Sequence, residues 1–311
     1  MHGVITVLAG SMHTLTSVSL GALALAVALH VGKLSAEARS WHGIVQHAQA
    51  PHRVRFRTTF CAFVSSIGVN AILPARVGTA LRVGVVRRNV PGSSVVTIAA
   101  TIVLETGIEV AFGAAVIAVM LLAGHSYHPS GSTPAMSGLA THPVVLTVIA
   151  CVASAALVLG LVYRQRARAV LARMAQGFSI MRSPGALVAR VLSWKLVAWA
   201  LRLGAVYAFL LAFHVPAAPW TALAVVAAQN VAGFLPLLPG NAGTQQAAIG
   251  VALAGTASAT ALLGFGVGMQ VATAIADLIL GAAGLALVAN RDDLRDALGT
   301  VRLRRRVPAV T

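Results

Sequence analysis

Residues 73–82 read LPARVGTALR and residues 238–247 read LPGNAGTQQA, so the frame L-P-x-x-x-G-T occurs twice, about 165 residues apart. Each copy interrupts an apolar stretch, at residues 58–86 and 221–253. Proline lacks a backbone N–H, and both proline and glycine disfavour a helix interior. In a bilayer, the freed backbone groups are tolerated only where protein or a water-filled cavity receives them. The frame therefore predicts two broken helices around sheltered polar sites.

The residues expected to break these helices are Pro74 and Gly78 in the first stretch and Pro236, Pro239, Gly240 and Gly243 in the second.

The composition places these stretches in a membrane. The 311 residues are 58% hydrophobic and only 10% charged, with a mean hydropathy of +0.86. A soluble core could not hide so much apolar surface. Five continuous apolar windows are long enough to cross a hydrocarbon core of roughly 30 Å. These predicted spans cover about residues 13–32, 93–123, 144–163, 185–213 and 260–289.

The distribution of the 23 lysines and arginines predicts the orientation of the spans. Basic segments alternate with segments that contain no lysine or arginine, which is the positive-inside pattern rather than a nucleic-acid-binding surface. The pattern predicts a plasma membrane protein with its N-terminus outside and its C-terminus in the cytoplasm. The basic segments are residues 33–57, 76–88, 164–190 and 291–306, and the uncharged ones are 124–143, 214–220 and 254–260.

The same charges predict how the broken helices enter the membrane. Arginines flank both ends of the first broken stretch, whereas the flanks of the second carry no charge. We therefore expect one re-entrant hairpin from each side, in an all-α polytopic bundle built from two inverted repeats. A single membrane domain is expected at residues 1–290, with repeats at 13–123 and 185–289, a connecting span at 144–163 and a basic tail at 291–311.

Several of these residues resemble the lysylphosphatidylglycerol synthase transmembrane-region family, the flippase-like domain, over residues from about 10 to 290. Where that family has P-G-G-x-G-x-x-E, this chain has Asn241 and Gln246, and Thr106 replaces an arginine after Glu105. These departures put in doubt whether this chain has the ion coupling of that family, but they do not put the family's fold in doubt. The matching residues are Asn70, Leu73, Pro74, Arg76, Gly78, Arg82, Leu104, Glu105, Glu109, Leu238, Pro239, Gly240 and Gly243.

The resemblance implies a translocase that moves an anionic or zwitterionic phospholipid, or a lipid-linked headgroup, between leaflets. Larger members carry a soluble transferase, but the longest polar segments here span only about 20 residues, too few for a catalytic domain. We therefore expect no enzymatic activity, no cofactor and no bound metal, and a separate lipid-synthesising enzyme as a partner. The alternative functions are a small-solute or ion-coupled secondary transporter and an intramembrane enzyme.

Charged residues inside apolar spans are the candidates for the substrate site, because charges at this depth face a partner or a cavity. Glu105 and Glu109 share one helix face, and inverted symmetry would bring their span close to that of Asp277. Arg76, Arg82 and Arg202 are expected to hold a lipid phosphate.

Three alternatives stay open for the basic residues. Arg82 could belong to the cytoplasmic anchor, Lys195 could extend to the membrane surface, and Arg202 could pair with Glu105 or Glu109. Four amide side chains could bind the headgroup or cap freed backbone groups, and these are Asn70, Asn230, Gln245 and Gln246. Asn241 is a further candidate for binding the substrate.

Overall fold

The computed structural model describes residues 18–73, 77–90, 92–122, 172–233 and 243–288, and within these ranges the chain is helical. The predicted all-α class is confirmed. In chain order, the elements are α2 (Leu20–Ala48), α3 (Phe56–Ile72), α4 (Val77–Asn89), α5 (Val95–Leu122), a 3₁₀ turn (Ser179–Arg182), α9 (Pro184–Leu187), a π turn (Val188–Leu192), α10 (Ser193–Ala212), α11 (Pro219–Gly233), α12 (Thr244–Ala252) and α13 (Ala259–Val288).

Four helical segments of the described chain are long and apolar enough to cross a membrane. Large apolar side chains remain exposed on them, such as Leu196 at 60% and Ile279 at 64%, as expected for surfaces that face lipid. The chain is thus a multi-pass membrane protein. The segments are Leu20–Ala48, Val95–Met120, Pro184–Ala212 and Ala259–Val288, and the connecting span expected at 144–163 and the tail at 291–311 lie outside the described residues.

Helix α2 differs from the expected first span, which ended at residue 32. The helix continues to Ala48, because one of its faces stays apolar beyond the first charged residues. Leu34, Ala38, Trp41 and Val45 follow helical spacing and are buried in one core cluster. Much of the segment predicted as a polar loop is therefore part of the helix.

Both predicted interruptions are present as helix ends. Helix α3 ends at Ile72 before α4 begins, and α11 ends at Gly233 before α12 begins. The two helices of each pair pack against each other. Pro74, Pro236, Pro239 and Gly240 lie outside the described residues.

Two glycines of the frame are described and have different roles. Gly78 lies inside α4, where a Cβ would clash with the backbone oxygen of Ser66, so glycine permits the close approach of α3 and α4. Gly243 precedes α12 with a φ of 82°, in the left-handed region that favours glycine.

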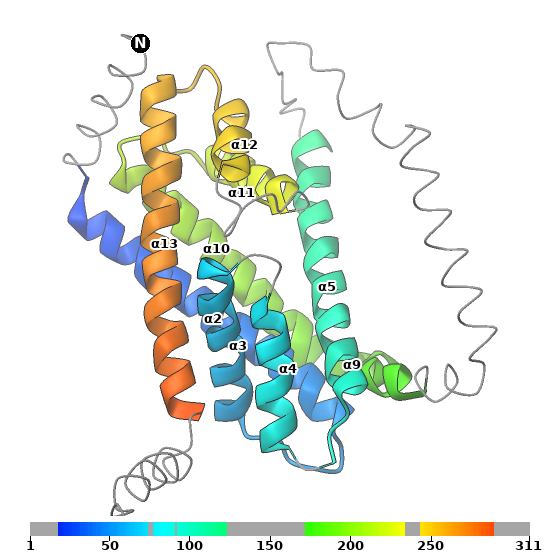
Figure 1. Ribbon diagram of the computed structural model, residues 1–311. Helices are drawn as coiled ribbons and strands as arrows, with labels where there is room; N and C mark the ends of the chain where they lie inside the picture. The colour runs from blue at the N-terminus through cyan, green and yellow to red at the C-terminus, as the bar shows by residue number, and fades with distance from the viewer. Residues whose placement is uncertain (1–17, 74–76, 91, 123–171, 234–242, 289–311) are drawn as a thin grey trace, which may run out of the picture.

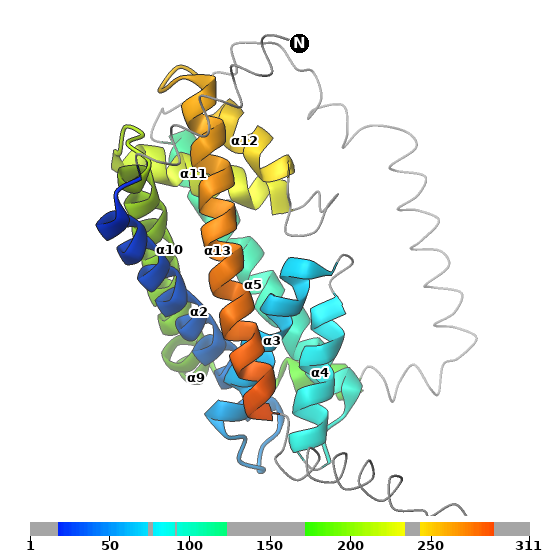
Figure 2. The same cartoon turned by 60° about the vertical axis from the view of Figure 1, so that its left-hand side comes forward.

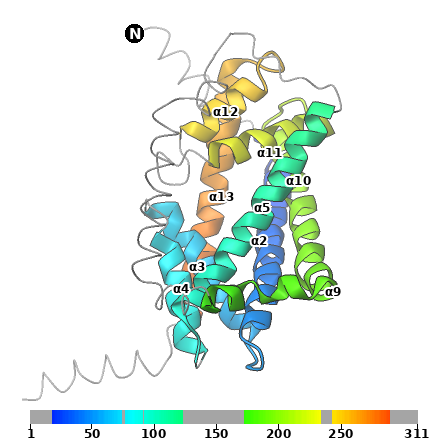
Figure 3. The same cartoon turned by 90° about the vertical axis from the view of Figure 1, so that its right-hand side faces the viewer.

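We refer to α3–α4 and α11–α12 as the two broken pairs, and they lie at opposite ends of the bundle. Helix α13 runs through most of its height, with α3 and α4 beside its lower half and α11 and α12 near its upper end (Figures 1 and 2). Helix α11 lies across the bundle rather than along it, while α5, α2 and α10 run through its height (Figure 3). Contact between α3 and α13 is close at Gly68 and Gly281, where an added Cβ would lie under 3 Å from the facing backbone.

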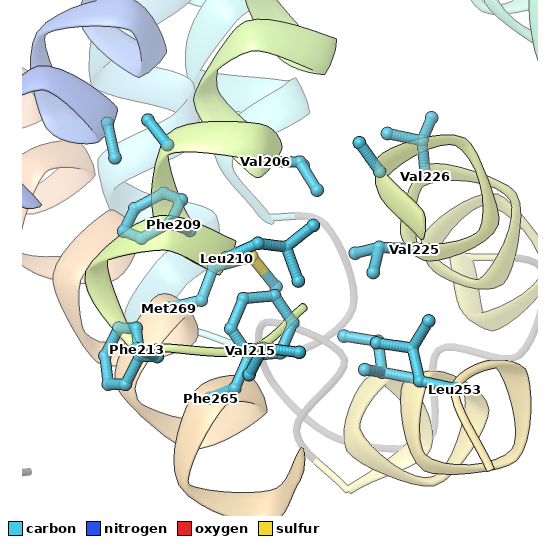
Figure 4. Packing of buried hydrophobic residues seen from close by; sticks show 14 of the residues in the cluster. Val206, Phe209, Leu210, Phe213, Val215, Val225, Val226, Leu253, Phe265 and Met269 are labelled. Carbon is cyan, nitrogen blue, oxygen red and sulfur yellow. The ribbon is translucent and has the colours of Figure 1, made fainter. Parts of the chain in front are cut away.

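Two separate apolar cores support the two broken pairs. The upper core joins α10, α11, α12 and α13 around Phe209, Phe213 and Phe265 (Figure 4). The lower core surrounds Trp41 and Phe63 and includes residues from α2, α3, α4 and α5. The charged side chains of the candidate site come from helices of both cores.

Candidate functional site

Arg82 and Glu105 form a buried ion pair that joins α4 to α5. Their side-chain atoms Nη2 and Oε2 are 2.6 Å apart, and each residue is only 7% exposed. The Arg82 guanidinium carbon lies 3.6 Å from the ring centroid of Trp41 and 4.6 Å from that of Phe63. Arg82 is thus part of the protein interior, and the alternative that it belongs to a surface anchor with Arg87 and Arg88 is wrong.

Glu109 bridges two basic residues of α10. Its Oε2 lies 2.7 Å from the Lys195 ammonium, and its Oε1 lies 3.4 Å from Nη1 of Arg202. Arg202 also donates from Nη2 to the Gln229 Oε1 atom on α11, at 3.2 Å. Of the predicted alternatives, Arg202 therefore pairs with Glu109. Lys195 is 2% exposed, so it does not extend to the membrane surface.

Helix α2 adds a set of polar residues that sequence reasoning missed. His30 Nε2 lies 2.9 Å from Asp277 Oδ1 on α13, and the Lys33 ammonium lies 3.5 Å from Glu37 one turn along. The spacing of Lys33 and Glu37 at i, i+4 was the available signal, because such a pair allows a helix to continue past its first charge. Asp277 is paired separately from Glu105 and Glu109.

Two of the four described candidate amides, Asn70 and Gln246, bond backbone groups at the helix breaks. The Asn70 Oδ1 atom accepts a hydrogen bond of 2.8 Å from the Gly78 N–H, and the Gln246 Oε1 atom accepts one of 2.7 Å from the Gly243 N–H. Gln246 also donates to Gln270 on α13. Asn230 packs against Gly113 on α5. Arg76 and Asn241 lie outside the described residues.

A cavity of about 200 Å³ lies between α2, α10, α11, α12 and α13, and we refer to it as the central cavity. Of the predicted site residues that the structure describes, Arg202 lines it. Gln245, next to the predicted Gln246, also lines it, although it was not among the favoured substrate-binding residues. The full lining is His30, Lys33, Arg202, Ala205, Val206, Phe209, Gln229, Gln245, Met269 and Thr273.

The central cavity lies near the middle of three of the long apolar segments. Lys33 is next to the midpoint of Leu20–Ala48, and Thr273 is at the midpoint of Ala259–Val288. Arg202 is about one helical turn from the midpoint of Pro184–Ala212. Polar and charged side chains therefore surround a cavity near the middle of three long apolar helical segments.

The model of the family described as "Lysylphosphatidylglycerol synthase TM region" matches residues 4–281. No curated protein and no solved structure gives a significant match.

Proposed function

The chain belongs to the lysylphosphatidylglycerol synthase transmembrane-region family, and from this membership we propose that it is a lipid translocase. It moves a phospholipid or lipid-linked headgroup between leaflets and does not modify it. A separate enzyme synthesises the lipid. The family membership supports the flippase-like role, and the position of the central cavity is the observation that carries it.

A polar cavity at mid-depth suits a carrier because charges inside a bilayer are costly, by roughly 2.5 to 3.5 kcal/mol on insertion scales, unless they face a partner or water. Here Arg202 and Lys33 face the central cavity. Secondary transporters bind substrates near the midplane, beside helices that are broken there. Gln245, one residue after the start of α12, brings the second broken pair to the central cavity.

The proposal includes an inverted arrangement of the two broken pairs. The loops joining α2 to α3 and α4 to α5 lie at one end of the bundle, away from α12 (Figure 1). Exposed arginines mark this end, including Arg53, Arg55, Arg87 and Arg88. By the positive-inside rule it is the cytoplasmic end, so the pair α3–α4 enters from the inside and α11–α12 from the outside. The N-terminus is then external and the C-terminus cytoplasmic.

Reconstitution tests this function. Vesicles containing the purified chain and a trace of fluorescent phosphatidylglycerol are treated with an impermeant quencher, and the rate at which inner-leaflet lipid becomes accessible is measured. We expect the wild-type protein to accelerate exchange over protein-free vesicles, and R202A to lose this effect. The control is R53A, because Arg53 is exposed in the α2–α3 loop.

Equal exchange with and without protein contradicts the proposal. Uptake of a water-soluble phosphate ester without lipid exchange would favour the secondary transporter instead.

A further inference from the structure

We propose that the central cavity binds the phosphate of an anionic lipid headgroup and disfavours headgroups that carry an added amine. This inference rests on the proposed function, because it specifies which lipid the translocase accepts. It is argued from the charges that line the cavity, from the looseness of their present contacts and from the space available.

The lining of the central cavity is cationic. Arg202 and Lys33 contribute permanent positive charges, and the other polar residues are His30, Gln229, Gln245 and Thr273. None of the described residues that line it is an aspartate or a glutamate. A ligand in the cavity therefore meets positive charge and hydrogen-bond donors, which suit a phosphate or carboxylate.

The neighbouring acids do not fully satisfy these cations. Glu109 is closest to Lys195, at 2.7 Å, and its contact with Arg202 is longer, at 3.4 Å. Lys33 is 3.5 Å from Glu37. Charge-assisted hydrogen bonds normally measure about 2.7 to 2.9 Å, so both lining cations are only loosely paired. By contrast, the contact between Arg82 and Glu105 measures 2.6 Å, as expected for a fully formed ion pair.

The neighbouring charges are balanced in number but not in position. Four basic residues of this region, Lys33, Arg82, Lys195 and Arg202, face the glutamates Glu37, Glu105 and Glu109 and the aspartate Asp277, which pairs with His30 at 2.9 Å. Of these eight charged residues, only Lys33 and Arg202 line the central cavity, so the positive charge is concentrated where a phosphate would bind.

Donors from three helices converge on the same space. The Arg202 guanidinium has five N–H donors, of which the structure shows contacts to Glu109 and Gln229. The Gln229 Nε2 group is 3.7 Å from the Met269 sulfur, a weak acceptor that a phosphate oxygen would readily replace. Lys33 lines the cavity from α2. An oxyanion in the cavity would therefore meet donors from α2, α10 and α11.

The size of the cavity restricts the headgroup. A volume of about 200 Å³ is below the range of about 300 to 1,000 Å³ typical of drug-sized ligands. It accommodates a phosphate with a small alcohol, while the acyl chains remain in the lipid. An aminoacyl extension would add bulk and place an ammonium beside Lys33 and Arg202, where like charges repel.

Binding measurements on the full-length protein in detergent test this assignment without requiring transport. Titrations use short-chain phosphatidylglycerol, its lysyl ester and inorganic phosphate, with isothermal calorimetry as the readout. The variants are R202Q and K33Q, with R53Q as the matched control outside the cavity. Thermal unfolding of each variant identifies any that fail to fold.

We expect phosphatidylglycerol to bind the wild type and R53Q equally, and R202Q and K33Q each to weaken binding on the order of 10-fold, because each removes charge-assisted hydrogen bonds. The lysyl ester should bind more weakly than phosphatidylglycerol. Unchanged affinity in folded R202Q and K33Q, or tighter binding of the lysyl ester, overturns the inference. If inorganic phosphate alone binds with this dependence, the headgroup assignment is wrong and the ligand is free phosphate.

These outcomes are separable from those of the transport assay. Arginine-dependent lipid binding without accelerated leaflet exchange supports the anion site and counts against the translocase. Lipid exchange that does not change in the Lys33 and Arg202 variants supports the translocase and counts against the anion site.

Discussion

The guanidinium carbon of Arg82 lies 3.6 Å from the ring centroid of Trp41, while its Nη2 atom contacts Glu105 at 2.6 Å. The aromatic ring covers one face of the cation, and the carboxylate neutralises it at the edge. The pair lies in the lower core, apart from the central cavity. This arrangement locks α2, α4 and α5 together, so we assign it to the stability of the first broken pair.

Removing one member of the Arg82–Glu105 pair should destabilise the protein strongly. The R82A and E105A variants each leave a buried charge without its partner, and the expected loss is about 3 to 5 kcal/mol in the free energy of unfolding. Thermal unfolding in detergent measures the change, with R53A as the control. The double variant R82M/E105L should be more stable than either single variant, because no unpaired charge remains. Single variants as stable as the wild type would contradict the buried pair.

The two basic residues of α10 should separate stability from transport. Lys195 is 2% exposed and approaches Glu109 to 2.7 Å, whereas the Arg202 side chain is 17% exposed and borders the central cavity. We expect K195M to lower the free energy of unfolding by about 3 kcal/mol, as for other buried ion pairs that lose one partner. R202Q should retain more stability and lose lipid exchange. The reverse ranking, with K195M stable and R202Q unfolded, would contradict these roles.

The crossing of α3 and α13 should not tolerate side chains. A Cβ on Gly68 would lie 2.8 Å from the Gly281 Cα, so G68A forces the two helices apart. Overpacking of this kind costs about 1 to 3 kcal/mol. The control is G107A on α5, where an added Cβ meets nothing within 4 Å and alanine should be neutral or stabilising. A melting temperature lower in G107A than in G68A would contradict the close crossing.

Cysteine labelling tests the opposed entry of the two broken pairs. In a chain whose native cysteines are replaced by alanine, S258C lies in the exposed α12–α13 loop and H52C in the exposed α2–α3 loop. An impermeant maleimide should label S258C in intact cells and H52C only after the membrane is opened. Labelling of both positions from the same side would eliminate the inverted arrangement and leave the anion site as a separate question.

Local sequence signals predicted the helix breaks but not the partners of the charges. The L-P-x-x-x-G-T frame located the end of α3 and the start of α12, because proline and glycine act on the backbone within a few residues. The hydropathy window ended the first span at residue 32, before Lys33, and so excluded Glu37 and Trp41 from the first helix. The pairing of His30 with Asp277 joins residues 247 apart in sequence. Such a contact depends on how α2 packs against α13, which no local pattern specifies.

Gln246 occupies the position at which the family pattern has an acid, and its contacts predict the effect of restoring that acid. Its Oε1 accepts from the Gly243 N–H at the start of α12, and a glutamate keeps this acceptor while adding a negative charge that a helix N-terminus favours. The Gln270 amide can turn to donate to the new carboxylate. Q246E should therefore be as stable as the wild type or more so, whereas Q246L should lose about 1 kcal/mol, because the Gly243 N–H loses its partner.

Thermal unfolding distinguishes the two substitutions, and the lipid exchange assay then measures whether the restored acid makes transport depend on a pH gradient. Q246L as stable as the wild type would show that the amide does not cap α12. Q246E less stable than Q246L would show that the site excludes negative charge, so that glutamine is required here because it is neutral.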